Sequence, residues 1–189
     1  MAEIYLIRHG ESCWNLANKF TGSINVPLSD HGRFEAKKLT AKFAKINLTG
    51  VFVSSLIRAQ ETALIALSHA NTSQLLYGNE QAFSGNLPVW IDSRIDERSY
   101  GDLQGMNKEE AKAEFGEKQV HEWRRSYSTR PPSGESLADT VVRVREFAEE
   151  RLIPMLTENA QVAIFAHGNS IRALHMLFLD INSDEIMEF

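Results

Sequence analysis

The sequence contains a single cysteine, Cys13, among its 189 residues. A lone cysteine cannot form an intramolecular disulfide, which excludes a disulfide-stabilised secreted scaffold and favours a reducing compartment. No apolar run approaches the length that spans a membrane, and the first run, residues 4–7, is far too short for a signal peptide. We therefore expect a cytoplasmic protein with no membrane partner.

The sequence also lacks an excess of positive charge. Its formal net charge is −5 at pH 7, with 20 lysines and arginines against 25 aspartates and glutamates. Nucleic acids and anionic membrane surfaces are usually bound through a broad basic field, which this composition does not provide. We expect no nucleic-acid partner, and any anionic ligand must be bound by a local cluster of cations.

Several catalytic and metal-binding signatures are missing as well. The chain has no Gly-x-x-x-x-Gly-Lys-Ser/Thr nucleotide loop and no Gly-x-Ser-x-Gly nucleophile elbow. It has six histidines, but no His-x-His, His-Glu-x-x-His or cysteine pair supplies the spacing of metal ligands. We expect no metal, and we interpret four of the histidines as surface or packing residues: His31, His69, His121 and His175.

Short apolar runs alternate with longer amphipathic stretches along most of the chain. The runs are typical of buried strands and cover residues 4–7, 51–53, 89–91 and 162–165. Apolar residues recur at helical spacing in 33–46, 57–70, 135–156 and 170–179. This alternation predicts an α/β fold, a single three-layer domain over 1–189 with a mainly parallel sheet flanked by helices.

Residues 92–134 break the alternation because they are polar, highly charged and end in a proline- and glycine-containing run. We expect an excursion over the sheet edge that covers the active site, with one or two short helices near 107–115 and 117–126. Excursions of this length in compact domains are usually functional.

The first and last predicted strands end in the same pattern, His-Gly-x-Ser, which begins at His9 and at His167. In a parallel sheet both imidazoles would leave at the same edge, where they could share one ligand. Neutral imidazole is a good nucleophile near neutral pH. A single His-Gly pair is more often a core histidine, but the repeated pattern and the cations near it favour a functional site.

Two arginines are expected beside these histidines. Arg8 precedes His9, and Arg58 lies about one turn into the helix predicted after the second strand. Arginine binds phosphate oxygens through two N–H groups, and a helix start adds a positive dipole end. Arg58 alone would more often be a surface residue paired with Glu61. With both histidines, the two arginines predict a pocket for a phosphoryl group.

A proton-transferring carboxylate is expected in the charged segment after the third strand. Asp96, Glu97 and Asp102 all lie there. The residue pattern alone does not choose between the three.

Together these motifs resemble the histidine phosphatase superfamily and, within it, the cofactor-dependent phosphoglycerate mutases. The similar segments extend over nearly the whole chain: 8–12, 14–15, 20–22, 97–108, 123–125 and 166–174. The resemblance implies the interconversion of 3-phosphoglycerate and 2-phosphoglycerate in glycolysis and gluconeogenesis through a phosphohistidine. It also implies 2,3-bisphosphoglycerate as primer and intermediate.

Residue by residue, the resemblance implies that His9 accepts the phosphoryl group and that Glu97 transfers protons. It implies that Arg8, Arg58 and His167 hold the phosphoryl group, with help from the Gly168 backbone and the Asn15 side chain. The positions that would bind the rest of the substrate are Ser12, Thr21, Gly22, Tyr100, Lys108, Arg124, Arg125 and Asn169.

The chain departs from the family at two places. The stretch 130–136 is shorter than in the larger mutases, which affects the contacts expected in a homodimer or other homo-oligomer. The family continues beyond Phe189 into another strand and a mobile tail, which we expect to be absent here.

Two other functions remain as alternatives. One is a phosphatase of the same superfamily that acts on small phosphorylated metabolites, with water as the phosphoryl acceptor. The other is a non-catalytic phospho-ligand-binding protein, which we would expect to lack His9, Glu97 or His167, yet all three are present.

Overall fold

The computed structural model of the protein describes residues 1–68, 81–84 and 87–188. Their strands form one sheet in the order β1-β5-β2-β4-β3. The bounds are β1 (Glu3–Arg8), β2 (Gly50–Val53), β3 (Gln81–Ser84), β4 (Leu87–Ile91) and β5 (Gln161–Ala166). The first four in sheet order are parallel, and β3 pairs antiparallel with β4. The four predicted strands are confirmed, whereas β3 was not predicted because its residues form no apolar run.

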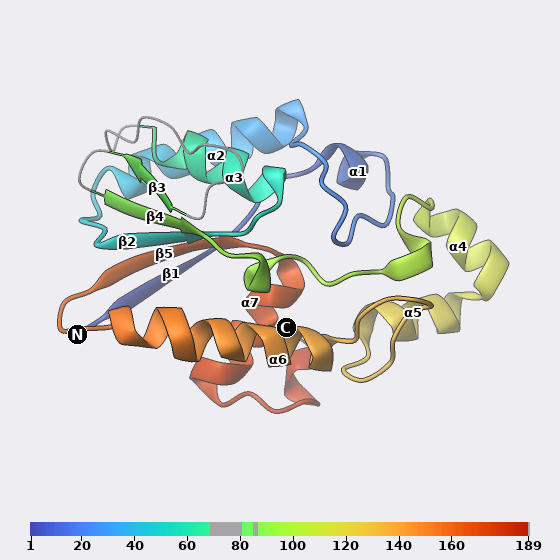
Figure 1. Ribbon diagram of the computed structural model, residues 1–189. Helices are drawn as coiled ribbons and strands as arrows, with labels where there is room; N and C mark the ends of the chain where they lie inside the picture. Colours follow the sequence, from blue (N-terminus) through green and yellow to red (C-terminus); the bar gives the residue numbers. More distant parts are fainter. Residues whose placement is uncertain (69–80, 85–86, 189) are drawn as a thin grey trace.

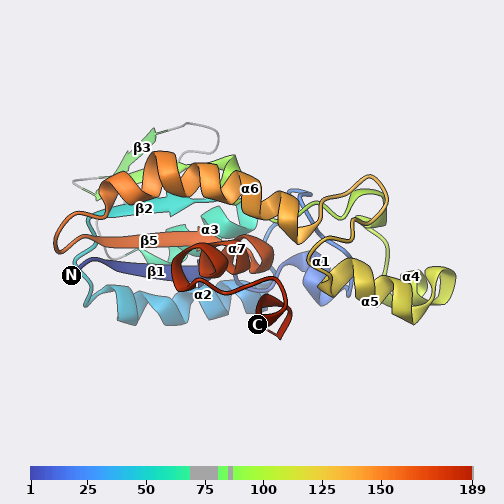
Figure 2. The same cartoon turned by 90° about the horizontal axis from the view of Figure 1, so that it is seen from below.

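Helices cover both faces of this sheet, which confirms the three-layer α/β architecture (Figure 1, Figure 2). The covering helices are α2 (Asp30–Phe43) and α3 (Ile57–Ala66) on one face, and α6 (Leu137–Phe147) and α7 (Gly168–Leu179) on the other. Side chains alternate between the faces of a strand. Val53 and Phe165 therefore join the core under α2 and α3, whereas Phe52 and Ile164 join the core under α6 and α7. None of the helices in the described segments is long and apolar enough to cross a membrane.

Helix boundaries differ from the predicted ones for local reasons. The α2 helix begins at Asp30, before residue 33, because the Ser29 hydroxyl accepts the Gly32 N–H at 3.0 Å and caps the first turn. The α3 helix ends at Ala66, and residues 69–70 of the predicted helix lie outside the described residues. The α6 helix ends at Phe147 and continues as a π-helical turn and a 3-10 turn, in which Pro154 has no N–H for an α-helical bond.

Segment 92–134 lies beyond the carboxyl ends of the parallel strands, where α1 is also found (Figure 1, Figure 2). Its helices are α4 (Lys108–Phe115) and α5 (Glu117–Arg125), as predicted, and α1 covers Cys13–Leu16. Short 3-10 turns in the described segments are Ser93–Ile95, Gly101–Leu103, Ile153–Met155 and Glu185–Glu188. A small separate core ties this segment to the loop after β1: Phe20, Leu103, Ala111, Val120 and Trp123.

Two glycines let the loop after β1 pack directly on the start of α2. A Cβ atom on Gly10 would lie 2.4 Å from the Gly32 carbonyl oxygen, and one on Gly32 would lie 2.0 Å from the Glu11 carbonyl oxygen. Both obstacles are backbone atoms, so neither could move aside cheaply. This backbone-to-backbone contact holds the residue that follows His9 at the carboxyl edge of the sheet.

Candidate active site

Two histidines lie side by side at the carboxyl edge of the sheet. β1 and β5 pair in parallel with Arg8 opposite Ala166, so that His9 and His167 are the next residues on neighbouring strands. Their ring centroids are 4.9 Å apart. The prediction that both imidazoles leave the sheet at one edge is therefore confirmed. Of these two histidines, only His9 lines the cavity found there, and the His167 side chain is fully buried.

His9 is a neutral imidazole with one free nitrogen lone pair. Its Nδ1 lies 2.6 Å from the Gly10 carbonyl oxygen, which can only accept, so the ring hydrogen is on Nδ1. Nε2 is then the unprotonated nitrogen and accepts the Arg58 Nε–H at 3.3 Å. Burial, followed by the charge of Arg58, lowers the pKa of His9 to about 4. The ring is therefore neutral and nucleophilic at pH 7.

Arg58 connects His9 to the loop opposite. It is the second residue of α3 and only 1% exposed, and Glu61 pairs with Arg33 instead. The interpretation of Arg58 as a surface partner of Glu61 is therefore wrong. Its Nη2 and Nη1 donate to the carbonyl oxygens of Gly22 and Ile24 at 2.7 and 2.8 Å. Burial lowers the pKa of Arg58 to about 10, so the side chain remains a cation at neutral pH.

Of the three candidate carboxylates, Glu97 alone lines the cavity. Asp96 is hydrogen-bonded to Ser54 and Ser55, and Asp102 to the hydroxyl of Ser133. The structure therefore places Glu97, and neither aspartate, at the cavity.

Glu97 is held in its ionised form by its surroundings. Its Oε1 accepts the side-chain amide of Asn169 at 2.9 Å and the backbone N–H of Arg98 at 2.9 Å. Burial raises the pKa of Glu97, but these hydrogen bonds and the charge of Arg58 outweigh burial and keep that pKa below its ordinary value. Glu97 is thus a base at neutral pH.

The cavity has a volume of about 470 Å³ and is strongly cationic. Its lining contains one carboxylate, Glu97, and seven lysines and arginines: Arg8, Lys19, Arg58, Lys108, Arg124, Arg125 and Arg172. The predicted residues Asn15, Thr21, Gly22, Tyr100, Gly168 and Asn169 also line it. Burial, together with Arg124 and Arg8, lowers the pKa of Lys108. Such crowding of cations around one cavity fits a small ligand with several negative charges.

Ser12 differs from the expectation that it contacts the substrate. Its side chain is fully buried and does not line the cavity. The Ser12 hydroxyl accepts the Asn15 N–H at 3.1 Å and donates to Asn15 Oδ1 at 2.9 Å, which caps α1. Ser12 therefore orients Asn15, and Asn15 is the residue at the cavity wall.

The whole site lies within the part of the chain that matches a known family. The family model "Histidine phosphatase superfamily (branch 1)" matches residues 4–189. The chain belongs to the histidine phosphatase superfamily. Within this superfamily it is 41% identical to the 2,3-bisphosphoglycerate-dependent phosphoglycerate mutase of Gloeothece citriformis, over 98% of this chain and 88% of the relative. It is 39% identical to the enzyme of the same name from Protochlamydia amoebophila, over 100% of this chain and 90% of the relative.

Solved structures of the superfamily share the fold. A mycobacterial glucosyl-3-phosphoglycerate phosphatase in complex with VO3 superposes with a TM-score of 0.80 at 25% identity, covering 97% of this chain and 83% of that chain. The Bacillus stearothermophilus protein YhfR has a TM-score of 0.80 at 25% identity, covering 98% and 84%. Among the residues described here, no three His, Cys, Asp or Glu side chains gather to hold a metal ion.

The residue-by-residue assignments did not include every residue at the cavity. Lys19, Phe20, Ile171, Arg172 and His175 also line it. His175, interpreted from the sequence as a surface or packing residue, is partly buried and lines the cavity, whereas His69 lies outside the described residues. The missed signal was helical spacing, since 168, 171, 172 and 175 lie on one face of α7.

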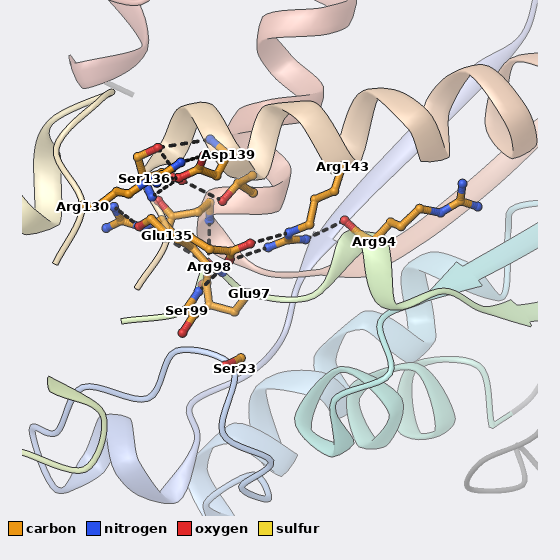
Figure 3. Close-up of polar contacts among 12 residues, drawn as sticks. Ser23, Arg94, Glu97, Arg98, Ser99, Arg130, Glu135, Ser136, Asp139 and Arg143 are labelled. Carbon is orange, nitrogen blue, oxygen red and sulfur yellow. Dashed lines mark hydrogen bonds and ion pairs between the residues drawn. The ribbon is translucent and has the colours of Figure 1, made fainter. Parts of the chain in front are cut away.

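Arg98 ties the Glu97 segment to α5, which carries Arg124 and Arg125. The Arg98 side chain is fully buried, and its Nη2 donates to the Trp123 carbonyl oxygen at 2.9 Å. The next residue, Ser99, donates its N–H to Glu135 Oε2 at 2.8 Å, and Arg143 pairs with the same carboxylate (Figure 3). These bonds set the position of Glu97 relative to Arg124 and Arg125.

The low pKa of His9 predicts that the unphosphorylated protein becomes less stable as the pH falls from about 6.5 to about 4. In that window the unfolded chain binds a proton at residue 9 and the folded chain does not, so stability decreases with decreasing pH. The contribution of this one group is about 3 kcal/mol across the window. Urea unfolding at several pH values should show a shallower decline for His9→Ala than for wild type. If the stability of wild type and His9→Ala decreased equally with falling pH, the prediction that His9 is buried in its neutral form would be contradicted.

Proposed function

We propose that this chain is a 2,3-bisphosphoglycerate-dependent phosphoglycerate mutase, which interconverts 3-phosphoglycerate and 2-phosphoglycerate in glycolysis and gluconeogenesis. One observation carries the proposal: a neutral, buried histidine borders a cavity lined by seven cations and one carboxylate. A phosphoglycerate carries a phosphate at one end and a carboxylate at the other, so it matches a cavity with cations on more than one wall. The names of the relatives support the same enzyme.

The chemistry assigned to the chain is phosphoryl transfer through His9. Nε2 of His9 forms the N–P bond while the P–O bond of the donor breaks, and the leaving oxygen takes a proton from Glu97. Glu97 has received that proton from the acceptor hydroxyl in the preceding transfer, or from solvent in the priming step. In the reverse step an acceptor hydroxyl loses its proton to Glu97 as its oxygen forms the P–O bond and the N–P bond breaks. Transfer between the two hydroxyls of glycerate is thus the same step run in both directions.

Arg58 is positioned to donate a hydrogen bond first to His9 and then to the phosphoryl group bound to His9. Its Nε–H donates to the His9 nitrogen that would carry the phosphoryl group. Once that nitrogen is bonded to phosphorus, the same N–H is left to donate to a phosphoryl oxygen. We assign Arg8, the Gly168 backbone, Asn15 and His167 to the same phosphoryl group.

The rest of the cavity is assigned to the other end of the substrate. The Thr21 hydroxyl is buried and has no hydrogen-bond partner among the described residues, which fits a ligand in contact with it. The other residues assigned to this role are Gly22, Tyr100, Lys108, Arg124, Arg125 and Asn169, with Ser12 acting through Asn15. The donor set also suits 2,3-bisphosphoglycerate, which would supply the phosphoryl group that primes His9.

We further propose that residues 1–189 form one domain, that the protein acts in the cytoplasm, and that it forms a homodimer or another homo-oligomer.

A phosphatase acting on small phosphorylated metabolites is the second candidate. The observation that favours it is the similarity in fold to a glucosyl-3-phosphoglycerate phosphatase. A phosphatase uses the same His9 and Glu97, with water in place of the acceptor hydroxyl.

The two candidates are separated by one assay on the purified chain. 3-Phosphoglycerate is supplied with and without a trace of 2,3-bisphosphoglycerate, and both 2-phosphoglycerate and inorganic phosphate are measured. For a mutase we expect isomerisation that the bisphosphoglycerate stimulates, with little phosphate released. Release of phosphate without isomerisation would establish the phosphatase instead.

A further inference from the structure

A chain of hydrogen bonds joins the His167 ring to Ser54 and Asp96. His167 Nε2 lies 2.7 Å from the Ser54 hydroxyl oxygen, and this hydroxyl lies 2.6 Å from Asp96 Oδ1. Ser54 follows β2 and Asp96 follows a 3-10 turn after β4, so this chain of hydrogen bonds connects His167 to the ends of two neighbouring strands. The Ser54 and His167 side chains are both fully buried.

The direction of each hydrogen bond in this chain can be derived. The Asp96 carboxylate accepts throughout: Oδ1 takes the Ser55 N–H at 2.8 Å and Oδ2 takes the Ser55 hydroxyl at 2.6 Å. The single hydrogen of the Ser54 hydroxyl therefore points to Asp96. With its hydrogen used, the Ser54 oxygen can only accept, from the Leu56 N–H at 3.1 Å and from His167. His167 must then carry its hydrogen on Nε2.

We propose that Asp96 and Ser54 are positioning residues that hold His167 as the Nε2–H tautomer. Nδ1 then stays free to take up a proton from solvent as the anionic phosphoryl group binds and to donate a hydrogen bond to a phosphoryl oxygen. Nδ1 is buried and has no hydrogen-bond partner in the part of the chain that the structure describes, so an interaction with a ligand would satisfy it. The proposal rests on the proposed function only in naming the phosphoryl group as that ligand.

The charges around His167 explain why such a chain is needed. Burial lowers the pKa of His167 well below its ordinary value, and Arg58, His9, Arg143 and Arg8 lower it further. The ring is therefore neutral before ligand binds, and a neutral ring can place its hydrogen on either nitrogen. The oriented Ser54 oxygen removes this choice, in the way that a buried acceptor fixes the tautomer of a catalytic or metal-binding histidine.

Four variants separate this role from general support of the fold. Ser54→Ala removes the acceptor of the His167 hydrogen, and Asp96→Ala frees the Ser54 hydroxyl to turn and donate to His167. Asp96→Asn keeps an acceptor oxygen for Ser54. Ser55→Ala is the matched control, because it breaks a hydrogen bond to the same carboxylate and leaves the bonds between Asp96, Ser54 and His167 in place.

The first measurement is nitrogen-15 NMR of the histidine rings in the ligand-free protein. We expect His167 as a single Nε2–H tautomer in wild type, Ser55→Ala and Asp96→Asn, and loss of that tautomer in Ser54→Ala and Asp96→Ala. A wild-type ring with its hydrogen on Nδ1, or the same tautomer in all five proteins, would overturn the proposal. This measurement needs no substrate, so its result tests the tautomer of His167 whether or not the proposed function is correct.

The second measurement is the kinetics of phosphoryl transfer by the same proteins. We expect kcat to fall about 10- to 100-fold in Ser54→Ala and Asp96→Ala, the usual cost of removing a group that orients a functional histidine, with KM nearly unchanged. Asp96→Asn should recover most of kcat, and Ser55→Ala should resemble wild type. An equal loss in Ser55→Ala would overturn the positioning role. Absence of mutase activity in wild type would overturn the proposed function alone.

Discussion

Replacing His9 with alanine should abolish the acid-labile phosphoenzyme and slow phosphoryl transfer by about four orders of magnitude or more, the scale seen when a catalytic nucleophile is removed. The variant lacks Nε2, the nitrogen that would form the N–P bond. The cations that line the cavity remain, so substrate binding should persist. The measurements are retention of radiolabelled phosphate after incubation with 2,3-bisphosphoglycerate, its release in acid, and the rate of isomerisation.

The matched control is His121→Ala. His121 is an exposed residue of α5 that does not line the cavity, and its loss should leave both labelling and isomerisation at wild-type levels. Wild-type transfer in His9→Ala, or acid-labile phosphate that survives in it, would contradict the assignment of His9. Calorimetric titration with 3-phosphoglycerate checks that the variant still binds its substrate.

Replacing Glu97 with glutamine should slow transfer about 10²- to 10⁴-fold, the range for loss of a general acid or base. Glutamine has nearly the same shape and keeps an oxygen that can accept the Asn169 side-chain amide. It cannot accept a proton from a hydroxyl or return one to a leaving oxygen. Its neutral amide also repels an anionic substrate less than a carboxylate does. We therefore expect kcat to decrease strongly while the dissociation constant for 3-phosphoglycerate stays similar or decreases.

Asp102→Asn provides the comparison for Glu97→Gln. Asp102 lies in the same segment, but its carboxylate contacts Ser133 and does not line the cavity. Its variant should transfer phosphoryl groups at the wild-type rate. A fast Glu97→Gln enzyme would show that protons move by another route, and a slow Asp102→Asn enzyme would show that the segment responds to any loss of charge.

The sequence predicted the layers of the fold well because the signals are local. Strands buried on both faces appear as continuous apolar runs, and all four parallel strands were found at such runs. β3 lies at the antiparallel edge of the sheet, and its four residues form no such run. The start of α2 was placed too late because the prediction followed the apolar periodicity and not the cap at Ser29.

The prediction of the site was good for residue types and weaker for contacts. The repeated His-Gly-x-Ser pattern predicted that His9 and His167 meet, since strand register is a regular property of parallel sheets. Which of Asp96, Glu97 and Asp102 reaches the cavity depends on the path of an irregular segment, and no periodicity encodes that path. The residue pattern left this choice open, resemblance to the family favoured Glu97, and the structure places Glu97 at the cavity.

The sequence by itself determined the α/β fold, the pair of histidines and the cations that make an anion site, because periodicity and short motifs are read directly along the chain. Only the tertiary structure decided the state and surroundings of those groups. The neutral form of His9, the contact of Arg58 with the 22–24 carbonyls and the path from Asp96 through Ser54 to His167 all depend on burial and on distances between segments far apart in sequence. Such interactions form only when the strand ends and segment 92–134 pack against each other, so they cannot be predicted from local sequence patterns.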